Sequence, residues 1–250
     1  MSVSWSAKTF RAARLTIWVA VSFIGAQFIV SYLLSVLAMI FPMLGKMNES
    51  VYVTIYAAMS YSLAVLLAIG IPWWLGRRTN KRELGLGRVP TWSDIGLGIL
   101  GYVAYIALSL VVSSTISLLL RGGHLNEAQD LPFSHLVQNF EFIVAFMTLV
   151  VIAPFAEELL FRGYLLGKLR SFMPVWIAIT LSALAFGAMH LPGSTGLQWL
   201  VGIDTFVMGI VVGILRVRTG NIWAGVLVHA IKNAIAFYCL FINPVIVGML

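Results

Sequence analysis

The sequence predicts an all-α fold: a polytopic transmembrane helical bundle of about seven membrane-spanning helices that form a single integral membrane domain. Two observations predict it. The 250 residues are 60% hydrophobic and only 10% charged, whereas a soluble domain carries about 25% charged residues. The apolar runs are also long and lack the strict alternation of barrel strands. Because lipid offers the backbone no hydrogen-bonding partner, such runs favour helices.

A helix needs about 20 apolar residues to cross a membrane, and the sequence offers seven such runs. An eighth crossing follows if the first run splits near Gly25 or if the tail 243–250 turns back. In chain order, the expected helices are 15–41, 51–75, 93–120, 141–166, 173–190, 198–215 and 222–242.

The first expected helix follows Lys8, Arg11 and Arg14. Its apolar run is too long for the core of a signal peptide, and no small-residue cleavage site closes it neatly, so we expect a retained helix. The basic loop 76–92 separates the second helix from the third. The fourth helix carries charged residues inside its apolar run, and the remaining helices follow one another through short polar connections.

The basic residues cluster in alternate connections between these helices. Such an excess marks the cytoplasmic side of a membrane protein, which predicts a cytoplasmic N-terminus and a cytoplasmic 76–92 loop. The net charge of +7 does not predict nucleic-acid binding, because these residues form short clusters rather than a stripe. The cytoplasmic set is Lys8, Arg11, Arg14, Arg77, Arg78, Lys81, Arg82, Arg88, Lys168, Arg170, Arg216 and Arg218, and the opposite side holds Lys46 and Arg121.

Cysteine and loop histidines give little support for a metal site. Cys239 is the single cysteine, so an internal disulfide and a four-cysteine metal site are excluded. The outer connection 121–140 contains His124 and His135. Two histidines at this spacing are weak evidence for a metal, and we expect them to be solvated loop residues.

Two adjacent carboxylates and an arginine lie inside the apolar run of the fourth expected helix. Glu158 and Arg162 are four residues apart with the acid first, the favoured order for an ion pair on one helix face. Glu157 lies about 100° around the helix from Glu158, so it faces elsewhere and is the better candidate for a proton acceptor. Burial of ionisable groups in a membrane is costly, which makes this stretch a functional-site hypothesis.

Two histidines recur at helical spacing in the later helices. Phe186 and His190 are one turn apart, as are His229 and Asn233, so each pair shares a helix face. The rise of the helices places these groups in a buried cavity in the cytoplasmic half. Asp204 is a further buried acid, for which a hydrogen bond to another helix is slightly favoured over a role in chemistry.

These residues suit either of two chemistries. Glu157 beside a histidine can take a proton from water, while His229 and Asn233 can donate hydrogen bonds to the oxygen that gains charge when water attacks a peptide carbonyl. That set describes peptide hydrolysis. One glutamate and two histidines can instead bind zinc and leave a position open for water, and the spacing does not decide between the two.

The motifs together resemble the CAAX protease and bacteriocin-processing (CPBP or Abi) family of intramembrane proteases. The resemblance covers about 141–237, so 141–240 is expected to be the protease core and 1–140 a variable set of N-terminal transmembrane helices. The motifs are Glu157-Glu158-x-x-x-Arg162, Phe186-x-x-x-His190, Phe206-x-x-Gly209-x-x-x-Gly213, Thr219-Gly220-Asn221-Ile222-Trp223 and His229-x-x-x-Asn233.

The resemblance implies roles for these residues. Glu157 and His190 would activate water, His229 and Asn233 would form the oxyanion site, and Glu158 and Arg162 would support them. The family has been described both as glutamate-based and as metal-dependent. We favour the glutamate mechanism without a cofactor. If zinc is present, its expected ligands are Glu157, His190 and His229.

The resemblance also implies an intramembrane endopeptidase whose partners are a peptide or membrane-protein substrate and the lipid bilayer. Short multi-pass members are typical of the bacterial plasma membrane, where peptide maturation or bacteriocin self-immunity is the expected role. The alternative is a non-proteolytic membrane protein, either a proton-coupled carrier or an immunity scaffold. A carrier ordinarily has two related halves with interrupted helices, whereas the polar residues here concentrate in the second half.

Overall fold

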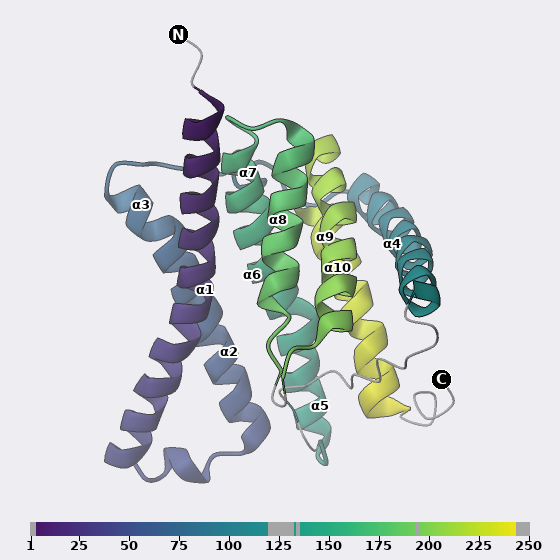
Figure 1. Cartoon of the computed structure of the whole chain (residues 1–250). Coiled ribbons are helices and arrows are strands. Elements are labelled where there is room, and N and C mark those ends of the chain that lie inside the picture. Colours follow the sequence, from purple (N-terminus) through teal and green to yellow (C-terminus); the bar gives the residue numbers. More distant parts are fainter. Residues whose placement is uncertain (1–3, 120–132, 134–135, 194–195, 244–250) are drawn as a thin grey trace. The chain divides into compact units, whose positions relative to one another are not determined.

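The computed structural model describes residues 4–119, 133, 136–193 and 196–243. Helices dominate these ranges (Figure 1), and the only other pairing within them is an isolated bridge between Pro192 and Leu197. The α-helices are α1 (Trp5–Ile40), α2 (Glu49–Val65), α3 (Ile71–Trp74), α4 (Trp92–Leu119), α5 (Asn139–Phe146), α6 (Ala153–Glu158), α7 (Leu166–Leu169), α8 (Val175–Met189), α9 (Trp199–Thr219) and α10 (Trp223–Phe237).

Several of these helices contain wider, π-helical turns, through which the helix continues without a break. A short 3₁₀ turn, Leu44–Lys46, lies between α1 and α2. The π-helical segments are η2 (Leu66–Gly70), η3 (Met147–Ile152), η4 (Leu159–Leu165) and η5 (Tyr238–Ile242).

The helical membrane bundle predicted from the sequence is confirmed, and each of the seven expected helices is present. Six are long and apolar enough to cross a membrane: Trp5–Ile40, Glu49–Trp74, Trp92–Leu119, Asn139–Leu169, Trp199–Thr219 and Trp223–Ile242. The seventh, α8, has 15 residues and is therefore about 22 Å long, shorter than the hydrocarbon core of about 30 Å.

An eighth crossing does not arise from the first apolar run, because α1 continues through Gly25 without a break. The other possible source, the tail 244–250, lies outside the described residues, as do His124 and His135 of the connection 121–140.

The chain divides into two compact units, each drawn from three separate segments. Unit 1 comprises Met1–Ile17, Asn80–Asp130 and Phe161–Val228, and unit 2 comprises Trp18–Thr79, Leu131–Leu160 and His229–Leu250. The expected division into 1–140 and a protease core 141–240 concerns sequence relationship and stays a prediction.

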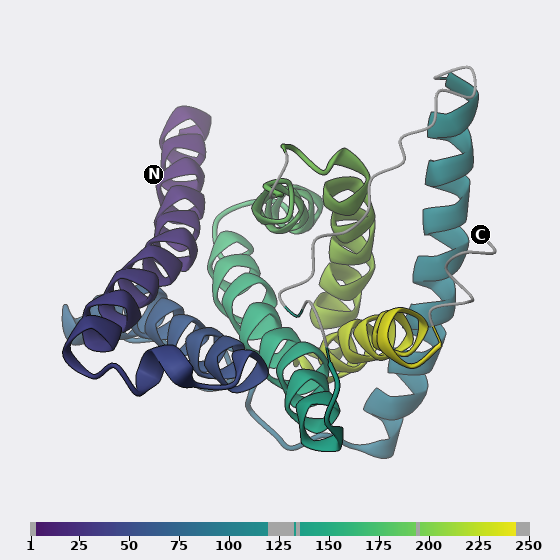
Figure 2. The ribbon, with the colours of Figure 1, turned by 90° about the horizontal axis from the view of Figure 1, so that it is seen from below.

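In unit 1, α8 and α9 pack closely side by side (Figures 1 and 2). The contact depends on glycines. A Cβ atom added at Gly187 would lie 2.7 Å from the carbonyl oxygen of Gly202, and one added at Gly209 would lie 2.9 Å from Cβ of Ala183. Small residues allow helix backbones to approach closely in membranes, so packing accounts for the Gly209-x-x-x-Gly213 motif.

Substitution of Gly209 by alanine is expected to lower the free energy of unfolding by about 1–3 kcal/mol, because the added methyl group overpacks this contact. Gly96→Ala is the matched control, since a Cβ atom there meets nothing within 4 Å. Thermal unfolding in detergent checks both variants. Equal melting temperatures for the two would contradict the close approach at Gly209.

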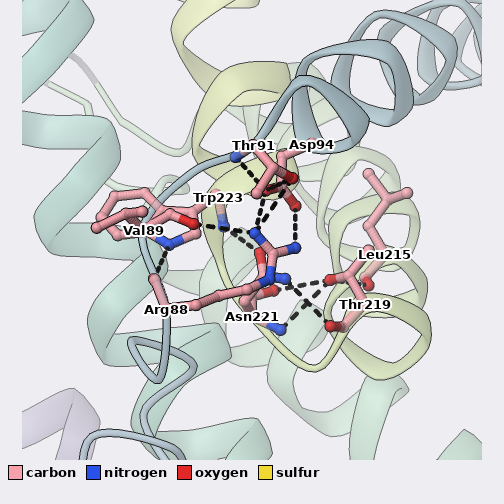
Figure 3. A network of polar contacts seen from close by, with 8 residues as sticks. All are labelled: Arg88, Val89, Thr91, Asp94, Leu215, Thr219, Asn221 and Trp223. Carbon is pink, nitrogen blue, oxygen red and sulfur yellow. Dashed lines mark hydrogen bonds and ion pairs between the residues drawn. The ribbon is translucent and has the colours of Figure 1, made fainter.

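The loop before α4 is fixed to the helical core of unit 1. Arg88 donates to both carboxylate oxygens of Asp94, at 2.6 and 2.9 Å, and its backbone oxygen accepts the indole N–H of Trp223 at 2.8 Å (Figure 3). The hydrogen bonds to Asp94 raise the pKa of Arg88 above its ordinary value. Asp94 also accepts from the backbone N–H of Thr91, which caps the start of α4.

The same loop also contacts α7 and α9. Lys168 forms an ion pair with Glu83 at 2.8 Å, and Arg216 donates to the Glu83 backbone oxygen at 2.7 Å. The expectation that Arg216 is a loop residue was wrong: it lies in α9 and is 4% exposed. Its buried guanidinium stabilises the loop instead of marking a solvated helix end.

In unit 2, polar contacts join α2 to the helix that begins at Asn139. Asn48 accepts the backbone N–H groups of Ser50 and Val51 at the start of α2, and its amide donates to Glu141 at 2.6 Å. Farther along the same two helices, the hydroxyl groups of Thr54 and Thr148 lie 2.8 Å apart. These contacts fix the register of α2 along α5 and η3. The register determines which α2 side chains lie near α6, the next segment of the chain.

Candidate active site

The two adjacent glutamates lie on a short α-helical segment between two π-helical ones. Segment α6 holds Glu157 and Glu158, with η3 before it and η4 after it. Pro154 near the start of α6 explains the first irregularity, because proline has no N–H group to continue the hydrogen-bond ladder. Such π-helical turns are frequent at functional sites.

Asn233 replaces the donor that Pro154 lacks. In η3 the N–H group of Ala153 bonds to the Thr148 carbonyl five residues earlier, and Pro154 would be the next donor, to the carbonyl of Leu149. Instead, the side-chain amide of Asn233 on α10 donates to that carbonyl at 2.8 Å. A neighbouring helix thus satisfies the backbone group that the proline leaves open.

The carboxylate of Glu157 is buried at 5% exposure and has a different neighbour at each oxygen. The Tyr61 hydroxyl of α2 donates to Oε1 at 2.6 Å. The His229 imidazole of α10 places Nε2 at 3.8 Å from Oε2. Glu157 and His229, two of the predicted catalytic residues, thus face each other in unit 2.

His229 also faces the second glutamate. Its Nδ1 atom lies 3.5 Å from Oε1 of Glu158, so the imidazole ring is placed between two carboxylates. Glu158 has no exposed surface and His229 is 4% exposed. The expected ion pair of Glu158 with Arg162 stays a prediction.

Arg162, in unit 1, is held against an aromatic ring. Its guanidinium carbon lies 4.1 Å from the centroid of Phe186, within the range of a cation–π interaction. Its side chain is 1% exposed. The guanidinium of Arg162 is thus buried inside the protein.

His190 ends α8 in unit 1. Its Nδ1 atom lies 2.9 Å from the Phe186 carbonyl oxygen, and the two rings meet edge to face with centroids 4.7 Å apart. Phe186 therefore contacts both Arg162 and His190. The expected cooperation of His190 with Glu157, which belongs to unit 2, stays a prediction.

Two backbone carbonyls of the π-helical segment η4 accept hydrogen bonds from other helices of unit 1. The Ser182 hydroxyl of α8 donates to the Phe161 oxygen at 2.9 Å, and Nε of Arg216 donates to the Arg162 oxygen at 3.3 Å. The wide turn next to the glutamates is thus fixed by side chains from α8 and α9.

Asp204 is hydrogen-bonded to another helix, as the sequence slightly favoured. Tyr105 of α4 donates to both of its oxygens, at 2.7 and 2.8 Å, and Ser109 donates to one of them at 2.6 Å. These contacts lie within unit 1 and join α9 to α4.

Sequence reasoning missed Tyr61 and the structural role of Arg216. Tyr61 is 96 residues from Glu157 in the chain, and a tyrosine in an apolar helix carries no local signal for such a contact. Arg216 did offer a signal, because the apolar run continues to Val217 beyond it, which is consistent with a helix that extends past the arginine.

The zinc alternative needs three donor side chains close together. Within neither unit do the described residues bring together three His, Cys, Asp or Glu side chains that could hold a metal ion. Glu157 and His229 belong to unit 2 and the third expected ligand, His190, to unit 1. The zinc site stays a prediction.

Comparison with known proteins gives a match over the region that carries these residues. Residues 139–235 match the family described as type II CAAX prenyl endopeptidase Rce1-like. An Escherichia coli protein described as an uncharacterized 24.3 kDa protein is 32% identical over 89 residues, which are 35% of this chain and 40% of that protein. No solved structure matches the chain.

A second relative covers more of the chain. The uncharacterized protein YyaK of Bacillus subtilis is 30% identical over 194 residues, which are 71% of this chain and 58% of that protein. The chain thus spans about half the length of the curated relatives it matches. Residues 139–235, which hold each of the predicted site residues, thus match a family of CAAX prenyl endopeptidases, which supports the resemblance to the CAAX protease and bacteriocin-processing family.

Proposed function

We propose that the protein is an intramembrane endopeptidase that hydrolyses a peptide bond of a membrane-associated peptide or protein, with Glu157 as the base that activates water. One observation carries the proposal: the buried Glu157 carboxylate accepts a hydrogen bond at Oε1 and faces an imidazole at Oε2. A carboxylate enclosed in this way can exchange a proton with water at the reacting bond.

The proposed reaction has two steps. One O–H bond of water breaks as its proton passes to Glu157, and the water oxygen bonds to the peptide carbonyl carbon while the carbonyl π electrons move to its oxygen. Glu157 then returns the proton to the peptide nitrogen, the charged oxygen re-forms the carbonyl double bond, and the carbon–nitrogen bond breaks. The family resemblance adds His190 as the second group that activates water.

The oxygen that gains charge needs hydrogen-bond donors, and we assign this role to His229 and Asn233. The Asn233 amide nitrogen carries two hydrogens, one of which is used at the Leu149 carbonyl. We assign the second hydrogen of this amide to the oxygen that gains charge. The Leu149 contact fixes its direction, as a preorganised oxyanion donor requires.

The substrate class follows from the setting. A chain with six apolar helices long enough for a membrane meets its substrate within or beside the bilayer. The family name points to prenylated CAAX peptides, and peptide maturation or bacteriocin self-immunity fits a bacterial plasma-membrane protein. The basic clusters support a cytoplasmic N-terminus.

The test uses purified protein in lipid nanodiscs and a library of membrane-associated peptides, with and without a prenylated CAAX end, analysed by mass spectrometry. We expect wild type to cut an internal peptide bond and Glu157→Ala and His190→Ala to leave the library intact. Retained cleavage in a strong chelator would support the glutamate mechanism over zinc. Cleavage that survives both substitutions would overturn the assignment, and proton-coupled transport without cleavage would favour a carrier.

A further inference from the structure

We propose that Tyr61 is a positioning residue for the Glu157 carboxylate, so that one of the N-terminal helices completes the active site. This inference rests on the proposed function of Glu157. It differs from the expectation that residues 1–140 form only a variable accompaniment to the protease core.

The Tyr61 hydroxyl is well placed to hold the carboxylate. It donates to Oε1 of Glu157 at 2.6 Å, a length typical of a hydrogen bond from a hydroxyl group to an ionised oxygen. The tyrosine ring is half-buried and lies 6.1 Å from the ring of Phe23, measured between centroids. The ring is thus packed on one side while its hydroxyl reaches the carboxylate.

The position of Tyr61 is set by the whole of α2. The contacts of Asn48 with Glu141 and of Thr54 with Thr148 come earlier along the same two helices. Tyr61 is the third polar group of this series. Three interhelical hydrogen bonds hold α2 in one register. The position of the tyrosine hydroxyl is therefore fixed by the other two hydrogen bonds as well as by its own.

The hydrogen bond from Tyr61 gives the two carboxylate oxygens of Glu157 different surroundings. Oε1 is engaged by the phenol, whereas Oε2 faces the His229 ring at 3.8 Å. We assign the proton from water to Oε2. Without the tyrosine hydroxyl, the carboxylate group is less restricted in rotation, and only part of its orientations place Oε2 toward the reacting water.

The substitution Tyr61→Phe isolates the hydroxyl, because the ring and its packing against Phe23 are retained. We expect kcat to fall by about tenfold, since a misplaced catalytic group loses part of its effective concentration, with KM within about twofold. The matched control is Tyr52→Phe, the same change on the same helix, about 13 Å away by helix rise, and it should keep the wild-type kcat. Melting temperatures of both variants are measured alongside.

A double-mutant cycle supplies a second measurement, which stands even if Tyr61→Phe loses stability. Glu157→Asp shortens the side chain by one methylene and withdraws its carboxylate from the tyrosine. In that background Tyr61→Phe should change kcat by less than about twofold. An equal fall in both backgrounds, or a Tyr61→Phe kcat equal to that of Tyr52→Phe, would overturn the inference. Absence of cleavage by wild type would instead overturn the proposed function.

Discussion

Replacing Glu157 by glutamine is expected to lower the kcat of peptide cleavage by about a thousandfold or more, within the range of a general base and the proton transfer it performs. Glutamine has nearly the same shape and can still accept the Tyr61 hydroxyl, but its amide cannot take a proton from water. Folded yield and melting temperature should therefore stay close to wild type. Single-turnover kinetics with a peptide identified in the library measure the change.

Glu141→Gln is the matched control on the same continuous helix. Glu141 accepts the backbone N–H groups of Val137 and Gln138 and the amide of Asn48, so it has a capping role at the start of α5. We expect this variant to lose about 1 kcal/mol of stability and to keep most of its kcat. A Glu157→Gln enzyme as active as Glu141→Gln would contradict the assignment of the base.

Replacing Arg216 by methionine is expected to lower the free energy of unfolding by about 3 kcal/mol. The guanidinium donates to the backbone oxygens of Glu83 and Arg162, and it is buried. Each buried acceptor that loses its donor costs about 1–3 kcal/mol. Gly85 adds to the constraint: a Cβ atom there would lie 2.8 Å from Nε of Arg216, so the loop passes directly over the guanidinium.

Arg218→Met provides the comparison, because Arg218 is exposed two residues later on the same helix. It should change stability by less than about 0.5 kcal/mol. Denaturation of both variants in mixed micelles measures the difference. If the two variants unfold at the same denaturant concentration, the loop is not held by Arg216.

The fold could be predicted because the cost of leaving backbone groups unpaired in lipid permits few alternatives. Seven apolar runs therefore became seven helices. The π-helical turns could not be predicted in the same way. Pro154 signals that the ladder breaks, but the donor that repairs it, Asn233, comes from a helix almost eighty residues later. Hydropathy records burial and says nothing of such a pairing.

The candidate site, like the fold, could be predicted only in part from the sequence. Glu157, Glu158 and His229 could be selected because charged or titratable groups are rare and costly inside apolar helices, and the structure brings them together. Tyr61 could not, because a tyrosine is common in membrane helices and its partner lies far along the chain. The role of His190 in activating water derives from the resemblance, whereas the pairing of Arg162 with Glu158 was predicted from their helical spacing. Both stay predictions.

The most direct test of Glu157 as the base for water attack is peptide cleavage in water enriched in oxygen-18. Hydrolysis places one heavy oxygen in the new C-terminal carboxyl group in the first turnover, which mass spectrometry detects. The account predicts a labelled product from wild type and from Glu141→Gln, and none from Glu157→Gln within the same time. Labelled product formed by Glu157→Gln at the wild-type rate would contradict it.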